Sequence, residues 1–145
     1  MGTVRCILQK KHGDVISVSP ETTVYSALEL MEENHIGSLV VMKDGKFVGI
    51  ITERDYARKV ILKGKASKET LVKEIMSEHP VTVTPDTTME QCMALMTSKY
   101  IRHLPVFDNN NLVGIVSIGD IVRYMIEEQK FIIEELEHYI TGHHE

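Results

Sequence analysis

The chain has 145 residues, of which 43% are hydrophobic and 26% are charged, and its formal net charge is −5. These values are typical of a globular protein with one or two small domains and a real core. The acidic balance argues against a nucleic-acid-binding protein, which would present a basic face. No apolar run is long enough to cross a bilayer, and the first residues lack the apolar segment of a secretory signal.

The first predicted elements are a strand, a helix and a hairpin. Residues 15–20 (VISVSP) are a short β-rich run that ends at a Ser-Pro step. Residues 22–36 have helical spacing, with Val24, Leu28, Met31 and His35-Ile36 on one face. Two apolar runs, 38–42 and 46–51, then flank Asp44-Gly45, which is a strong hairpin signal. A second helix is expected to begin at Thr52, a good N-cap residue.

The same order of elements recurs 65 residues later without a gap. A β-rich run at 81–85 precedes a helical pattern at 87–101, a hairpin around Asn109-Asn110-Asn111 and a helix that begins at Ser117. Pro20 matches Pro85 and Asp55 matches Asp120, as do many residues between them. Such self-similarity identifies two copies of one β-α-β-β-α unit. Cys92 takes the place of Ala27 in the earlier copy, so we expect it to be a small core residue.

The repeat predicts an α/β (α+β) fold in which the two copies pack sheet to sheet with pseudo-two-fold symmetry. The expected domains are 15–62 and 80–127, joined by a linker at 63–79 with a short helix. Residues 128–145 are expected to be a C-terminal helix extension, which runs to about Ile140, and a tail. Two cysteines make neither a disulfide framework nor a metal set, so the expected compartment is the reducing cytoplasm.

The C-terminal extension carries an apolar stripe. Its members recur every three or four residues: Val122, Met125, Gln129, Ile132, Leu136 and Tyr139. Such a stripe is expected to be buried, more often in an intrachain or dimer contact than on a membrane, because the other helix face is acidic.

The end of each copy has the features of an anion site. Thr52 and Ser117 follow an apolar strand, and Asp55 and Asp120 stand three residues later. The first turn of a helix offers unpaired N–H groups and the positive end of the dipole, which suit a phosphate. An ionised carboxylate accepts hydrogen bonds from both hydroxyls of a ribose cis-diol. Gly49 and Gly114 would leave room for a flat base at the strand. The alternative is that Asp55 and Asp120 only stabilise their helices, since an acidic residue in the first turn of a helix is favourable by itself.

The heptapeptides GIITERD (49–55) and GIVSIGD (114–120), preceded by HIGSLVV (35–41) and YIRHLPV (100–106), resemble a tandem pair of CBS domains, the Bateman module. The likeness covers residues 15–62 and 80–127 and extends to small stand-alone signal-transduction proteins of this family. It implies a regulatory module that binds adenosine-containing ligands (AMP, ADP, ATP, NAD-type dinucleotides or S-adenosylmethionine) in two clefts. It also implies a homodimer.

The resemblance assigns residues to each cleft. One nucleotide-binding cleft would use Ile16, Ile36, Arg102, His103, Ser117, Gly119 and Asp120. The other would use Thr52, Arg54, Asp55, Val81 and Ile101. The first copy has Gly37-Ser38 where the second has Arg102-His103, so we expect the Asp120 cleft to bind more tightly.

The sequence also bears on functions other than that of a sensor. No nucleophile elbow, Walker loop or paired His-Glu metal motif appears, so we expect neither catalysis nor a resident metal or cofactor. His138, His143 and His144 would be a metal set only if Thr141-Gly142 did not interrupt the helix. A ligand-independent scaffold is the main alternative, supported by the C-terminal stripe. The expected partners are an adenine nucleotide, a second copy and a regulated protein, with neither nucleic acid nor membrane.

Overall fold

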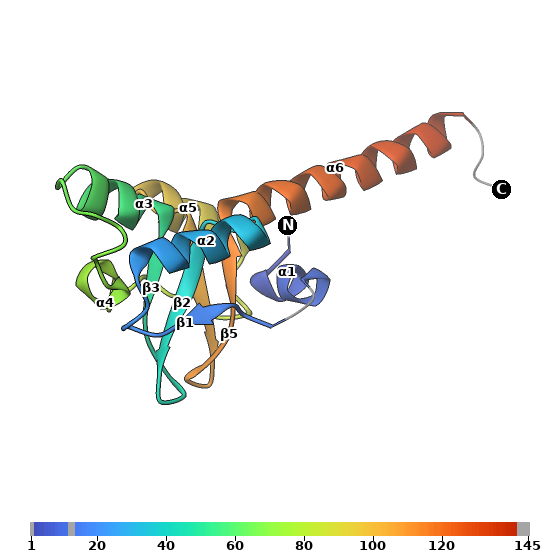
Figure 1. Cartoon of the computed structure of the whole chain (residues 1–145). Helices are drawn as coiled ribbons and strands as arrows, with labels where there is room; N and C mark the ends of the chain where they lie inside the picture. Colours follow the sequence, from blue (N-terminus) through green and yellow to red (C-terminus); the bar gives the residue numbers. More distant parts are fainter. Residues whose placement is uncertain (1, 12–13, 142–145) are drawn as a thin grey trace. The chain divides into compact units, whose positions relative to one another are not determined.

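The computed structural model describes residues 2–11 and 14–141, which fold as two compact units (Figure 1). The first, here the Asp55 unit, comprises Gly13–Thr82 with Asn109–Val113. The second, the Asp120 unit, comprises Met1–His12, Val83–Asp108 and Gly114–Glu145. The mixed α/β class and the two sheets predicted from the repeat are confirmed.

The Asp55 unit is built on a three-stranded sheet in the order β1-β2-β3. Strand β1 (Ser17–Val18) lies parallel to β2 (Ser38–Lys43), and β2 lies antiparallel to β3 (Lys46–Thr52). The hairpin turn has positive φ at Asp44 (51°) and Gly45 (75°), as the Asp-Gly pair predicts. The fully buried side chains of Leu39, Val41 and Ile51 point from β2 and β3 into the core of this unit.

Helices complete this unit. α2 (Val24–Asn34) begins at Thr23, whose side chain accepts a hydrogen bond from the N–H of Ser26, and α3 (Glu53–Tyr56) begins at Thr52. A π-helical turn, η1 (Ala57–Ile61), follows α3 directly. The prediction that His35 and Ile36 share the apolar face of α2 is wrong. The helix ends at Asn34, and His35 takes a left-handed conformation (φ 53°) and is exposed.

The short linker helix predicted near residue 72 is present as α4 (Val72–Ile75). The backbone N–H of Val72 donates to the Thr22 carbonyl (2.8 Å), and that of Lys73 donates to Pro20 (3.0 Å). Val72 and Ile75 are buried in the core of the Asp55 unit. α4 therefore belongs to the first copy, although it lies outside the predicted 15–62 range.

The Asp120 unit contains α5 (Met89–Lys99) and a hairpin of β4 (His103–Asp108) and β5 (Asn111–Ser117). The strand predicted at 81–85 is reduced to one parallel bridge between Val83 and Val106. That bridge stands 65 residues after the pair Val18 and Val41, so the repeat is preserved in the pairing of the strands. Cys92 on α5 is fully buried, which confirms its role as a core residue.

The sequence did not predict the N-terminal helix α1 (Val4–Lys10) of this unit. The N–H of Val4 donates to the Thr87 carbonyl (2.8 Å), and that of Arg5 donates to Pro85 (2.9 Å). Thr87 and Pro85 stand 65 residues after Thr22 and Pro20, the two residues that accept hydrogen bonds from α4. α1 therefore occupies in the Asp120 unit the place that α4 occupies in the Asp55 unit. The signal was a second repeat, at an offset of 68: TVRCIL (3–8) against LVKEIM (71–76).

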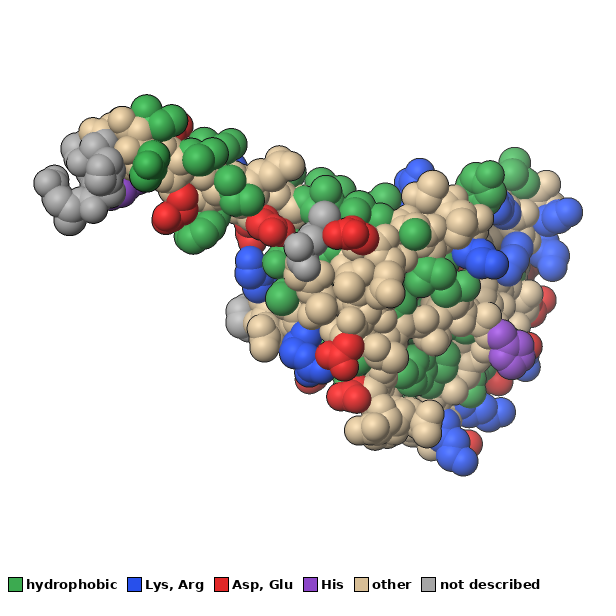
Figure 2. Space-filling view, turned by 180° about the vertical axis from the view of Figure 1, so that it is seen from behind, with side chains coloured by type: hydrophobic (Ala, Val, Ile, Leu, Met, Phe, Trp, Pro, Cys, Tyr) green, Lys and Arg blue, Asp and Glu red, His purple; other side chains and the backbone are tan. Residues whose placement is uncertain are grey.

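The last helix, α6 (Ile118–Ile140), ends where the sequence predicts. Its stripe, however, is not buried in this chain. Val122, Ile132 and Leu136 are about half exposed (47, 50 and 55%), and Tyr139 is more so (71%). Figure 2 shows hydrophobic side chains along this helix, with acidic ones beside them. None of the helices in the described ranges is long and apolar enough to span a membrane.

Candidate functional site

Asp120 is fixed at the point where β5 ends and α6 begins. The Ser117 N–H donates to Asp120 Oδ2 (2.9 Å), and the Asp120 N–H donates to Ser117 Oγ (3.1 Å). This reciprocal pair is a capping box, which satisfies two N–H groups at the start of a helix. In this structure the Ser-x-x-Asp pattern therefore caps the start of α6, as the structural alternative predicts.

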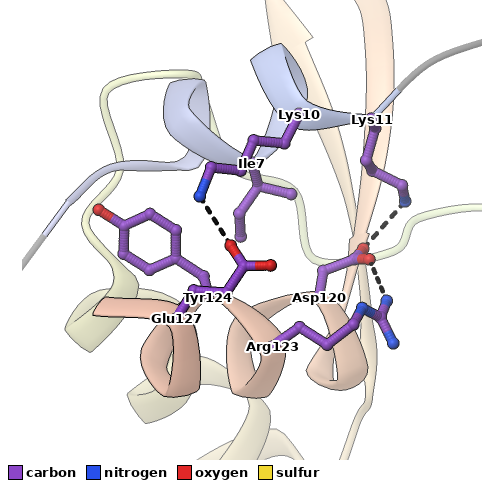
Figure 3. A pocket seen from close by; sticks show the side chains of 7 residues that line it. All are labelled: Ile7, Lys10, Lys11, Asp120, Arg123, Tyr124 and Glu127. Carbon is purple, nitrogen blue, oxygen red and sulfur yellow. Dashed lines mark hydrogen bonds and ion pairs between the residues drawn. The ribbon is translucent and has the colours of Figure 1, made fainter. Parts of the chain in front are cut away.

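The Asp120 carboxylate also forms ion pairs with two cationic side chains. Lys11 Nζ lies 2.9 Å from Asp120 Oδ2, and Arg123 Nη2 lies 2.7 Å from Oδ1 (Figure 3). The carboxylate side chain is only 7% exposed. Burial alone would raise the pKa of Asp120, but the Ser117 N–H, Lys11 and Arg123 outweigh it, so the pKa lies below its ordinary value.

A pocket of about 380 Å³ opens between α1 and α6 beside this carboxylate. Its lining consists of Ile7, Lys10, Lys11, Asp120, Arg123, Tyr124 and Glu127 (Figure 3). Lys10 Nζ binds Glu127 Oε2 at 2.8 Å and lies 5.2 Å from the centre of the Tyr124 ring. Three cations and two carboxylates thus face one small volume within a single unit.

Arg102 and His103 lie beside the N-terminus of α6, the helix that lines one side of the pocket. The N–H of Ile118, the first residue of α6, donates to the Arg102 carbonyl (2.9 Å). Burial lowers the pKa of His103; Asp120 opposes that shift, while Lys11 and Arg102 add to it. His103 is therefore held toward its neutral form.

The Asp55 unit repeats the cap with fewer cations. The Thr52 N–H donates to Asp55 Oδ2 (3.0 Å), and the Asp55 N–H donates to Thr52 Oγ1 (3.2 Å). Lys59 Nζ lies 3.2 Å from Asp55 Oδ1 and also donates to the Ile75 carbonyl (2.8 Å). Arg54 is half-buried on the same turn.

At the offset of 68 that relates α1 and α4, Lys10 and Lys11 correspond in sequence to Glu78 and His79, which lie beyond the end of α4. The two units share the capped carboxylate, but Asp120 is paired with Lys11 and Arg123, whereas Asp55 is paired with Lys59.

The two strand glycines do not leave room for a base, and that expectation is wrong. A Cβ built on Gly49 would lie 2.6 Å from the Ser77 carbonyl oxygen, because Ser77 pairs with Ile50 at the edge of β3. A Cβ on Gly114 would lie 2.7 Å from the Leu8 side chain. Both glycines instead let another segment of the same unit approach the strand.

The other predicted site residues divide between the units. Ser117, Gly119 and Asp120 lie together with Arg102 and His103 in the Asp120 unit, which also holds Ile101. Thr52, Arg54 and Asp55 lie together in the Asp55 unit, which also holds Ile16, Ile36 and Val81. Each predicted cleft draws on both units, so the clefts remain predictions.

Sequence reasoning missed most of the pocket lining: Ile7, Lys10, Lys11, Arg123, Tyr124 and Glu127. The α1 residues were missed because the sequence pattern predicts no helix before residue 15. Within residues 2–11 and 14–141, no group of three or more His, Cys, Asp or Glu side chains is placed to hold a metal ion. His143 and His144 lie outside the described residues.

The model of the CBS domain family matches residues 4–62 and 72–127. The chain belongs to the CBS-domain family. Each CBS segment contains one capping box with its aspartate, and each begins with the α1 or α4 helix that packs in the unit of the other segment.

Relatives with CBS domains are similar over most of the chain. The CBS domain-containing protein CBSX3, mitochondrial, from Arabidopsis thaliana is 43% identical over 135 residues, which are 90% of this chain and 66% of that protein. A solved signal-transduction protein with CBS domains from Burkholderia ambifaria MC40-6 is 45% identical, with a TM-score of 0.84 over 88% of this chain and 96% of its own. A hexameric CBS-CP12 protein from bloom-forming cyanobacteria is 31% identical, with a TM-score of 0.72 over 83% of this chain and 66% of its own.

Proposed function

We propose that this chain is a regulatory module that binds an adenosine nucleotide and passes its state to a partner protein. The observation that carries the proposal is the capped, nearly buried Asp120, which faces Lys10, Lys11 and Arg123 across one pocket. A carboxylate that accepts hydroxyl donors, beside cations that bind phosphate, matches the two ends of a ribonucleotide. AMP, ADP, ATP, NAD and S-adenosylmethionine are the candidate ligands.

The family supports a regulatory rather than a catalytic role. CBS pairs occur in proteins assigned to signal transduction, such as the Burkholderia relative. Binding regulates only when the ligand has different affinities for two arrangements of the protein. The arrangement that changes is proposed to involve the two units, since each predicted cleft takes residues from both.

A second copy is the proposed partner of α6. From Val122 to Tyr139 the residues of its stripe are separated alternately by three and four positions. This spacing is typical of the apolar face through which two helices pack against each other in a coiled coil. Large apolar side chains that stay half exposed over several turns mark an interaction surface rather than a bare monomer. Assembly is known for a relative, the hexameric CBS-CP12 protein.

The free Cys6 and Cys92 are compatible with the proposed cytoplasmic location.

Thermal unfolding with each candidate ligand tests the sensor. A ligand at a hundred times its dissociation constant stabilises the fold by about 2.7 kcal/mol, which raises Tm by roughly 5–10 °C. We expect at least one adenosine ligand to do so, and Asp120→Asn to remove most of the shift. If all five ligands leave Tm unchanged, the chain is a scaffold. Product analysis after incubation with nucleotides tests catalysis, and turnover would contradict the regulatory role.

A further inference from the structure

Residues 57–68 form a basic segment of the Asp55 unit, here called the basic surface. They include five Lys or Arg residues and no Asp or Glu, although the net charge of the chain is −5. Lys59 is paired with Asp55. Three others are exposed and form no ion pair with any residue of 2–11 or 14–141: Arg58, Lys63 and Lys65. These three cations are available to an acidic partner.

Two aliphatic side chains are exposed among these cations. Ile61 is 55% exposed and Leu62 is 76% exposed. In Figure 2, basic side chains gather beside hydrophobic ones at the upper right, over the segment that follows α3. Backbone hydrogen bonds fix this turn: the N–H of Leu62 donates to the Ala57 carbonyl (3.1 Å), and that of Lys65 donates to Val60 (2.9 Å). An apolar centre with a charged rim on an ordered segment is typical of a protein interface.

The outer turns of α6, residues 131–140, have the opposite charge. They contain three glutamates and no Lys or Arg, whereas residues 121–130 contain two acidic and two basic residues. All residues from 129 to 140 are exposed. A helical segment of this length is only marginally stable in water when nothing packs against it. A partner that covers its apolar side chains therefore stabilises it.

Two of these glutamates flank the apolar stripe. Leu136 belongs to the stripe, and Glu135 and Glu137 lie on either side of it, because successive residues of an α-helix are about 100° apart. Packing these turns against the same turns of a second, parallel α6 would bring like charges together, which is unfavourable. The outer turns instead fit a surface that has an apolar centre and a basic rim.

We infer that the outer turns of α6 dock on the basic surface of a second copy. Leu136 covers Ile61 and Leu62, and the flanking glutamates face the exposed cations of that surface. The inner part of the stripe, from Val122 to Gln129, stays available for contact between the two α6 helices. Because each copy carries both surfaces, two copies related by a two-fold axis make the contact twice. This inference rests on the proposed homodimer and names the surface that the helix reaches.

Sedimentation equilibrium of the full chain with paired charge reversals tests the inference. A surface variant carries Lys63→Glu with Lys65→Glu, and a helix variant carries Glu135→Lys with Glu137→Lys. Each variant alone sets like charges against each other and is expected to weaken the dimer about tenfold. An equimolar mixture of the two is expected to restore the wild-type dissociation constant, because both contacts of the mixed dimer then join opposite charges.

Lys43→Glu is the matched control, since Lys43 is an exposed lysine of the same unit outside the basic surface. It should leave the dissociation constant unchanged. A dimer that neither paired variant weakens overturns the docking while the homodimer stands. A wild-type chain that stays monomeric overturns both.

Two further outcomes assign the basic surface to another occupant and overturn the docking. The first is rescue when all four substitutions are placed in one chain, without rescue in the mixture, which means that the contact lies within a chain. The second is binding to phosphatidylserine vesicles that the surface variant loses while its dimer is unaffected, which means that the surface faces a membrane.

Discussion

Lys11 Nζ lies 2.9 Å from Oδ2 of Asp120, so the residue that follows α1 is joined to the first turn of α6 by an ion pair. The same ammonium donates to the Ile115 carbonyl at 2.9 Å, which fixes it above the end of β5. Asp120 thus has two roles: it caps its own helix and anchors the N-terminal segment.

Lys11→Gln is expected to make the protein less stable near neutral pH and to weaken the dependence of its stability on acid. The depressed pKa of Asp120 contributes stability that is present above the unfolded value, near 3.9, and is lost as pH falls through the folded value. Without Lys11 the folded pKa of Asp120 moves toward the unfolded one, so this contribution is smaller and the curves of the variant and the wild type converge as the pH falls. Urea unfolding between pH 3 and pH 7 measures it. Lys99→Gln should follow the wild-type curve, and identical curves for both variants would contradict the ion-pair role.

His103 is expected to reduce stability as the pH falls below about 6.5. Burial keeps its folded pKa below the unfolded one, so the unfolded state binds more protons between the two values. The stability gained from a neutral His103 is present above the unfolded pKa and lost as pH falls through the folded pKa. His103→Gln should flatten the dependence of Tm on pH between 7.5 and 5.5. An unaltered slope would show that His103 does not titrate differently in the folded state.

Both helix caps are expected to contribute similar stability. Thr52→Ala and Ser117→Ala each remove the side chain that accepts the N–H three residues on, which costs about 1 kcal/mol in the free energy of unfolding. Ser117→Thr keeps the acceptor and should lose little. Chemical denaturation compares the three variants. A loss in Ser117→Thr as large as that in Ser117→Ala would mean that packing, rather than the cap, is responsible.

The equivalence of α1 and α4 predicts matching losses for their buried isoleucines. Ile7 (4% exposed) and Ile75 (1% exposed) occupy corresponding positions, so Ile7→Ala and Ile75→Ala should each cost about 2–5 kcal/mol. Leu62→Ala, at a side chain that is 76% exposed, should change the free energy of unfolding by less than about 0.5 kcal/mol. A negligible loss in Ile7→Ala alone would show that α1 is not part of the folded unit.

The proposed homodimer depends on the outer part of α6. Leu136→Glu places a charge within the apolar stripe and is expected to shift sedimentation equilibrium toward monomer. Glu134→Gln, on the acidic face, is the control and should leave the mass unchanged. Because Leu136 is 55% exposed in the single chain, the substitution should not unfold it. An unchanged mass in Leu136→Glu would exclude this stripe as the interface.

The repeat and the turn chemistry could be read from the sequence because they are local. Thr23, Thr52 and Ser117 cap helices where hydroxyl residues precede helical periodicity, and Asp44-Gly45 turns a hairpin. What could not be read depends on contacts between distant segments. Lys11 meets Asp120 only because α1 packs in the unit of the second copy, 109 residues away along the chain. The strand glycines were misinterpreted for the same reason, since their neighbours come from other segments.

The exchange of α1 and α4 between the copies has a consequence for how the chain is made. Residues 13–82 form one continuous stretch that holds nearly the whole Asp55 unit, so this part is available to fold while the ribosome is still synthesising the remainder. The other unit needs residues from both ends of the chain. Its N-terminal helix must therefore wait, first for Pro85 and Thr87 and then for α6 in the last third of the polypeptide.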